Sequence, residues 1–260
     1  MLTRIYGIFL LLALSNNSNA ALLPKVEELE RLLATPPVEI EVVEPHLSDA
    51  KDQPHVVYLG YPVEKVFRMI FGAEWKTSAV IEFRALDGYV SRIPIERFDQ
   101  YHAYLVFAKS DAGEFRIDNL MQHERAVPLG PYYLVWDNIH NPGLIPEGGT
   151  YWPYQVNEIL MSQASKQALA SGEKSHRPPE LEKYCLSCHQ VNGFGGHKTP
   201  FDLAEQTKSL GKERFLAWVL NPASIKPETN MPAFNEGIPE TERRAIATRL
   251  FEYLNELPHE

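Results

Sequence analysis

Between residues 53 and 161, short apolar runs alternate with turn signals. Residues 56–58 and 80–83 are predicted strands, and four apolar residues recur at helical spacing: Val63, Val66, Phe67 and Ile70. Asp87-Gly88 precedes the run 89–93, and this pattern is typical of a β-hairpin. Further strands are predicted over residues 103–108, 132–136 and 154–159. Residues 53–161 are therefore predicted to form an α+β domain with more sheet than helix.

Beyond residue 177 the apolar spacing becomes helical. Residues 180–189 follow Pro178-Pro179, a favourable helix start. Residues 212–220 carry an apolar face that ends before Pro222, and residues 239–257 read as an amphipathic helix with acids in its first turn. Between them, three prolines predict an extended loop over residues 221–234. The pattern predicts a helical unit over residues 178–260, joined to the first by a linker at 162–177.

The N-terminus reads as a secretory signal peptide. A basic start at Arg4 is followed by ten apolar residues at 5–14 and by a small-residue cleavage site at Ser18-Asn19-Ala20. The apolar run is shorter than the roughly 20 residues that span a bilayer, although an uncleaved anchor remains an alternative. We expect residues 1–20 to be removed, the mature chain to have no transmembrane segment, and the protein to be periplasmic.

Residues 21–52 form an acidic arm with eight acids, three bases and four prolines. A short amphipathic helix after Pro24 and an extended run over 38–43 are predicted in it, so that the arm packs on the body or on a partner; a plain linker is the alternative. The whole chain has a net charge of −9. Because no basic stripe could neutralise phosphates, a nucleic-acid partner is not expected.

Cys185-Leu186-Ser187-Cys188-His189 carries the chemistry. The two cysteines are the only ones in the chain, and C-x-x-C-H is the attachment pattern of a c-type haem, with the thiols on the vinyl groups and His189 on the iron. A redox dithiol is the alternative interpretation of C-x-x-C. The pattern predicts one covalent haem c.

Met231 is the expected sixth ligand of the iron. It lies in the proline-rich loop, where Pro232 holds it extended and prolines reduce the entropy lost on ligation. A core position is the alternative for this methionine. His197 is an alternative sixth ligand, but it follows His189 closely in the chain, so it is poorly placed to reach the opposite face of the haem.

These features resemble a class I monohaem cytochrome c over residues 170–260. The resemblance rests on C-x-x-C-H, on Pro200, on the Asn-Pro to Met-Pro-x-Phe loop ending at Phe234, and on a closing helix. It implies an all-α cytochrome c domain over residues 178–260, in which the Pro200 carbonyl accepts the hydrogen bond of His189 and orients its ring.

Residues 53–161 resemble part of the molybdopterin-binding fold of the sulfite oxidase family. The resemblance rests on the scaffold patterns at 61–63, 85–94, 103–105, 129–136 and 154–159. That family holds molybdenum through a cysteine thiolate, and this chain has none to spare, so no molybdopterin and no catalytic residue are expected. The fold predicted for the chain is thus an α+β fragment of this kind followed by the all-α domain.

The functional hypothesis is a periplasmic c-type cytochrome that carries single electrons between donor and acceptor proteins, with its N-terminal domain docking the partner. A haem iron with two protein ligands has no open position, so a non-catalytic carrier is favoured over an enzyme. The alternatives are a haem subunit of a periplasmic oxidoreductase and a haem-based ligand sensor.

Overall fold

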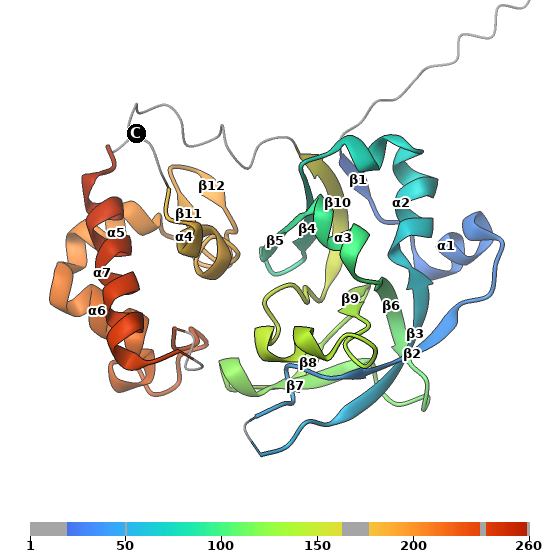
Figure 1. The fold of residues 1–260 in the computed structure, drawn as a ribbon, viewed down its shortest axis with the longest axis horizontal. Helices are drawn as coiled ribbons and strands as arrows, with labels where there is room; N and C mark the ends of the chain where they lie inside the picture. The colour runs from blue at the N-terminus through green and yellow to red at the C-terminus, as the bar shows by residue number, and fades with distance from the viewer. Residues whose placement is uncertain (1–19, 50, 163–176, 235–237, 259–260) are drawn as a thin grey trace, which may run out of the picture.

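The computed structural model describes residues 20–49, 51–162, 177–234 and 238–258. It shows an N-terminal unit of sheets and a smaller C-terminal unit that lie side by side (Figure 1). The predicted signal sequence up to residue 19 and all but the ends of the predicted linker lie outside the described residues. Within the described residues, no helix has the length and apolar character needed to cross a membrane.

Two four-stranded antiparallel sheets build the N-terminal unit. The first has the order β1 (Ala20–Leu22), β10 (Val156–Ser162), β4 (Val80–Ala85) and β5 (Val90–Pro94). The second has the order β2 (Val38–Val43), β3 (His55–Pro62), β6 (Ala103–Lys109) and β9 (Tyr133–Trp136). The extended run predicted in the acidic arm is β2, which pairs with β3 along its whole length. The arm is therefore part of the sheet.

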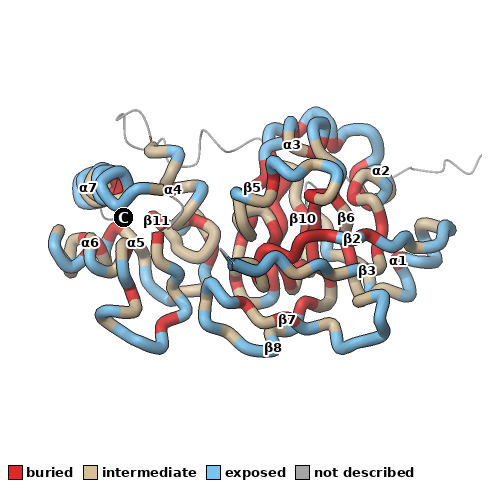
Figure 2. Tube along the Cα trace, turned by 60° about the horizontal axis from the view of Figure 1, so that its bottom comes forward, coloured by how far each residue is buried: buried red, intermediate tan, exposed pale blue. Residues whose placement is uncertain are grey.

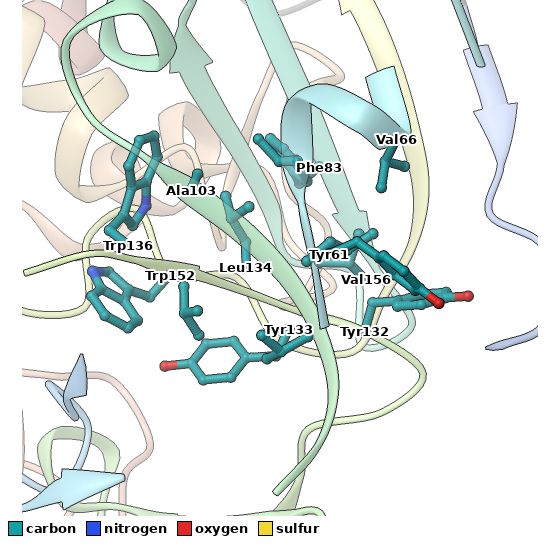
Figure 3. Close-up of a cluster of buried hydrophobic side chains, with 14 of the residues drawn as sticks. Tyr61, Val66, Phe83, Ala103, Tyr132, Tyr133, Leu134, Trp136, Trp152 and Val156 are labelled. Carbon is teal, nitrogen blue, oxygen red and sulfur yellow. The ribbon is translucent and has the colours of Figure 1, made fainter. Parts of the chain in front are cut away.

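One hydrophobic core connects the two sheets. Its buried residues include Phe83 and Val156 of the first sheet and Tyr61 and Leu134 of the second, and Figure 3 shows these side chains converging. Helices α1 (Val26–Leu33), α2 (Val63–Phe71) and α3 (Ile95–Gln100) contribute further buried residues. Burial follows the strands in Figure 2, as expected when apolar positions of both sheets face a shared interior.

Short elements complete the N-terminal unit. The 3₁₀ turn η1 (Glu74–Thr77) follows α2, and the hairpin β7 (Arg116–Asn119) and β8 (Glu124–Pro128) is connected by the turn η2 (Leu120–Gln122). The turn η3 (Pro142–Glu147) lies between β9 and β10.

The C-terminal unit begins with α4 (Pro179–Tyr184) and the two-stranded hairpin β11 (Gln190–Val191) and β12 (Phe194–Gly195). Helices α5 (Leu203–Leu210) and α6 (Lys212–Leu220), the turn η4 (Pro222–Ser224) and the closing helix α7 (Glu240–Glu256) follow. They share a second hydrophobic cluster that contains Leu181, Phe215 and Leu250.

The fold class predicted for the chain is wrong at its C-terminal end. The helix predicted over residues 180–189 stops at Tyr184, and the chain then turns into an antiparallel hairpin. The turn before this hairpin is hydrogen-bonded to β5, since the Val90 amide donates to the Ser187 carbonyl. In the described residues, several antiparallel sheets dominate and no separate all-α cytochrome domain is present.

Candidate functional site

The residues of the C-x-x-C-H motif are brought together by a single helical turn. The amides of Cys188 and His189 both donate to the Cys185 carbonyl, at 3.2 and 2.9 Å. Leu186, inside the turn, is fully buried in the C-terminal cluster and anchors it. Both thiols and the imidazole are therefore held by one short stretch of backbone, which we call the cysteine turn (residues 185–189).

Backbone hydrogen bonds dock the cysteine turn on the β4–β5 hairpin of the N-terminal unit. The Val90 amide lies 2.9 Å from the Ser187 carbonyl, and the His197 amide lies 2.9 Å from the Gly88 carbonyl. A Cβ on Gly196 would lie 2.0 Å from the Ser187 oxygen and 3.0 Å from the Gly88 oxygen. Only glycine allows this close approach.

Charged side chains reinforce the contact. Lys198 Nζ lies 2.9 Å from an oxygen of Asp87, in the hairpin turn. Arg92 from β5 pairs with Glu82 at 3.2 Å, and its guanidinium lies 4.3 Å from the ring centre of Phe194 in β12. These contacts place an ion pair and a cation–π contact at the junction of the two units.

Burial keeps the titratable groups of the cysteine turn uncharged. It raises the pKa of Cys185 to about 12, with a further contribution from Cys188. It raises the pKa of Cys188 to about 11, although the positive charge of Lys198 opposes this. Burial also lowers the pKa of His189. At neutral pH the turn therefore presents two thiols and a neutral imidazole.

The structure gives different surroundings to the other predicted site residues. Nδ1 of His189 lies 3.0 Å from the hydroxyl of Thr199, whereas Pro200, predicted to make this contact, is exposed. Met231 is partly buried against the same hydrophobic cluster as Cys185, and its amide donates to the Thr229 hydroxyl at 3.2 Å. His197 is exposed.

The prediction of one covalent haem c is corrected at this point. In the ranges that the structure describes, no group of three or more His, Cys, Asp or Glu side chains could hold a metal ion. Both cysteines are free, and the predicted support of His189 by Pro200 is not formed. This donor set does not support a covalent haem.

A second polar cluster went unpredicted and lies inside the N-terminal unit. The carboxylate of Glu44, just after β2, is completely buried. Hydroxyl groups of Tyr58 and Tyr133 donate to it at 2.7 and 2.9 Å, and Nδ1 of His46 lies 2.9 Å from it. No local sequence pattern predicts this cluster, because its tyrosines come from two strands, β3 and β9, that are distant in sequence.

Comparison with known proteins adds no relative. No protein-family model and no curated protein matches this chain. The structure corrects the resemblances to a class I monohaem cytochrome c and to the molybdopterin-binding fold. The described structure is a set of antiparallel sheets with helices, and its C-terminal unit is not the all-α domain that the cytochrome resemblance implies.

Proposed function

We propose that this chain is an exported electron-transfer protein in which the Cys185 and Cys188 thiols are the redox couple. Oxidation removes two electrons and two protons from the pair and forms one S–S bond; reduction reverses both changes. A disulfide or a quinone of a partner would accept the electrons and protons. The N-terminal unit is the scaffold on which the couple is docked and on which partners assemble.

The observation that carries the proposal is the convergence of both cysteines in one turn. No other cysteine exists in the chain to compete for them. The turn is fixed at its centre by Leu186 and held on the β4–β5 hairpin by the Val90 amide. A rigidly held pair at i and i+3 loses little entropy when the S–S bond forms.

Because the thiols are protonated at neutral pH, we propose an electron carrier and not a thiol–disulfide exchange enzyme. Thiol–disulfide exchange needs a thiolate, and thiols with raised pKa values are slow nucleophiles at neutral pH. The cysteine turn also follows the C-terminal end of α4, where the helix dipole disfavours a thiolate. The couple therefore differs from that of exchange enzymes and holds its electrons until a partner engages the turn.

An oxidising compartment suits such a couple, since disulfides persist outside the cytosol. The signal-like pattern before Ala21 supports export to the periplasm. The acidic chain, with a net charge of −9, favours donor and acceptor proteins that present a basic face.

Voltammetry of the full chain, produced with export, tests the proposal. We expect a reversible two-electron wave whose potential falls by roughly 59 mV per pH unit, because two protons accompany two electrons. The slope should hold from pH 6 to pH 9, below the pKa of about 11 of Cys188. The Cys185→Ser and Cys188→Ser variants should each lose the wave.

Two results would overturn the proposal. One is a wild-type protein with no wave under these conditions. The other is a pH-independent one-electron wave together with visible absorption that survives denaturation, because the electron would then reside on an attached group and not on the sulfur atoms.

A further inference from the structure

Tyr133 lies at the centre of the buried carboxylate cluster. Its hydroxyl donates to Oε1 of Glu44 at 2.9 Å and lies 3.0 Å from Nδ1 of His46. Tyr133 and Glu44 are both fully buried, and His46 is 7% exposed. The phenol proton of Tyr133 therefore points at a base that water does not reach.

Glu44 carries the buried carboxylate that faces the Tyr133 hydroxyl. Burial alone would raise the pKa of Glu44, but hydrogen bonds and charge from His46 and the hydroxyl of Tyr58 outweigh it and lower the pKa. Burial and the neighbouring Glu44 raise the pKa of Tyr133 well above its ordinary value. Loss of a proton alone from Tyr133 would place a second negative charge in the core, which is strongly disfavoured.

Loss of an electron together with transfer of that proton to Glu44 avoids this cost. The tyrosine becomes a neutral radical and the carboxylate becomes a neutral acid, so neither a tyrosinate nor a tyrosine radical cation forms in the core. Because added charge in a low-dielectric interior is costly, this combined step is favoured over loss of the proton or of the electron alone. The proton moves only along an existing hydrogen bond of 2.9 Å.

We propose that Tyr133 is a redox-active tyrosine that passes its hydroxyl proton to Glu44 when a one-electron oxidant removes an electron from its ring. The oxidant is a high-potential metal complex or metal centre, which is reduced by one electron in the step. This site is separate from the thiol couple and does not depend on it.

Aromatic rings connect Tyr133 with the junction between the two units. The rings of Trp152 and Tyr154 lie 6.1 and 6.4 Å from that of Tyr133, and Figure 3 shows Trp152 beside it. Nζ of Lys198 lies 6.0 Å from the ring of Tyr154. An electron can thus leave the core by short steps between rings, toward the junction where the cysteine turn is docked on the β4–β5 hairpin.

Tyr61 offers a matched comparison within the same core. It is also fully buried, and Figure 3 shows its hydroxyl pointing to the side opposite that of Tyr133. The hydroxyl of Tyr61 is buried without a hydrogen-bond partner among the described residues. With no base to take the proton, oxidation of Tyr61 would leave a positive charge in the interior, so Tyr61 should not react.

Flash oxidation with a photogenerated ruthenium(III) polypyridyl complex, followed by freeze-quenching and electron paramagnetic resonance, tests the assignment. The wild type should give a neutral tyrosyl radical, formed more slowly in D₂O. The signal should be lost in Tyr133→Phe and in Glu44→Gln and retained in Tyr61→Phe.

Replacing Tyr133 by 3-fluorotyrosine keeps the hydroxyl group and its hydrogen bond, so this test does not depend on a variant that could fail to fold. With 3-fluorotyrosine at position 133, the spectrum should gain a fluorine hyperfine splitting. An unsplit radical in that protein, a radical that survives in folded Tyr133→Phe, or one that disappears in folded Tyr61→Phe would overturn the proposal. Cysteine substitutions should leave the signal unchanged, which separates this test from that of the thiol couple.

Discussion

Replacing Glu44 by glutamine should be among the most destabilising single changes in the N-terminal unit. The carboxylate accepts four hydrogen bonds, from the amide and Nδ1 of His46 at 3.1 and 2.9 Å and from Tyr133 and Tyr58 at 2.9 and 2.7 Å. Glutamine keeps the shape but turns one acceptor into a donor that faces an existing donor. Hydrogen bonds to a charged group contribute about 1.5–3 kcal/mol each, but they are not additive. Disrupting a buried charged cluster costs about 3–5 kcal/mol.

We therefore expect Glu44→Gln to lower the free energy of unfolding by about 3–5 kcal/mol, against a typical total of about 5–15 kcal/mol. Urea denaturation followed by tryptophan fluorescence measures this change. Trp75, Trp136 and Trp152 are all buried in the N-terminal core and report its loss.

Glu41→Gln is the matched control. Glu41 in β2 pairs with His55 in β3 on the surface of the sheet. The Glu41 and His55 side chains are 55% and 53% exposed, and Nδ1 of His55 lies 2.9 Å from the carboxylate. Exposed pairs contribute less than about 1 kcal/mol. A loss below about 1 kcal/mol for Glu44→Gln, or equal losses for both variants, would refute the reasoning.

The same carboxylate predicts how stability depends on pH. The pKa of Glu44 is lower in the folded protein than its ordinary value. Its contribution is therefore complete above the unfolded pKa of about 4.3 and disappears as the pH falls through the lower folded pKa. Wild-type stability should fall more steeply in this acidic window than that of Glu44→Gln, and parallel curves would contradict the assignment.

Three further predictions concern the C-terminal unit and its docking. Gly196→Ala should cost about 1–3 kcal/mol, since its Cβ would meet the Ser187 oxygen at 2.0 Å; chemical denaturation should show no such loss for Gly143→Ala, whose Cβ meets nothing within 4 Å. Asp202→Ala removes the N-cap of α5, which accepts from the Ala204 amide at 2.9 Å, and should cost about 1 kcal/mol in thermal denaturation followed by circular dichroism. Lys198→Met breaks the ion pair with Asp87 and should speed hydrogen exchange of the Val90 amide; unchanged exchange would show that the pair does not hold the junction.

Local patterns were sufficient to predict most strands of the N-terminal unit. The Asp87-Gly88 turn predicted a hairpin, and β4 and β5 pair there, with Gly88 at a φ of 88° that favours glycine. The apolar stripe at 63–70 predicted a helix, which is α2. These elements depend on neighbours in sequence, and so their signals are short and complete.

Elements that depend on distant partners were less visible. Residues 38–43 were predicted to be extended, but their place in a sheet comes from pairing with β3. Helix α5 was missed, although Asp202 before it is a favourable N-cap residue. The Glu44 cluster had no sequence signal, because its donors at positions 58 and 133 are brought together only by the sheet.

The motif at residues 185–189 shows where sequence reasoning exceeded its evidence. A helix was predicted over residues 180–189, whereas the structure has a turn in which hydrogen bonds three and four residues apart bring the cysteines and the histidine together. The surroundings of the turn depend on residues 88–90, nearly a hundred positions earlier, and the contacts are between backbone groups. Backbone contacts affect the sequence only where a side chain would obstruct them and glycine is required. Gly88 and Gly196 are such positions, since a Cβ on either would lie about 3 Å from the backbone of the other unit.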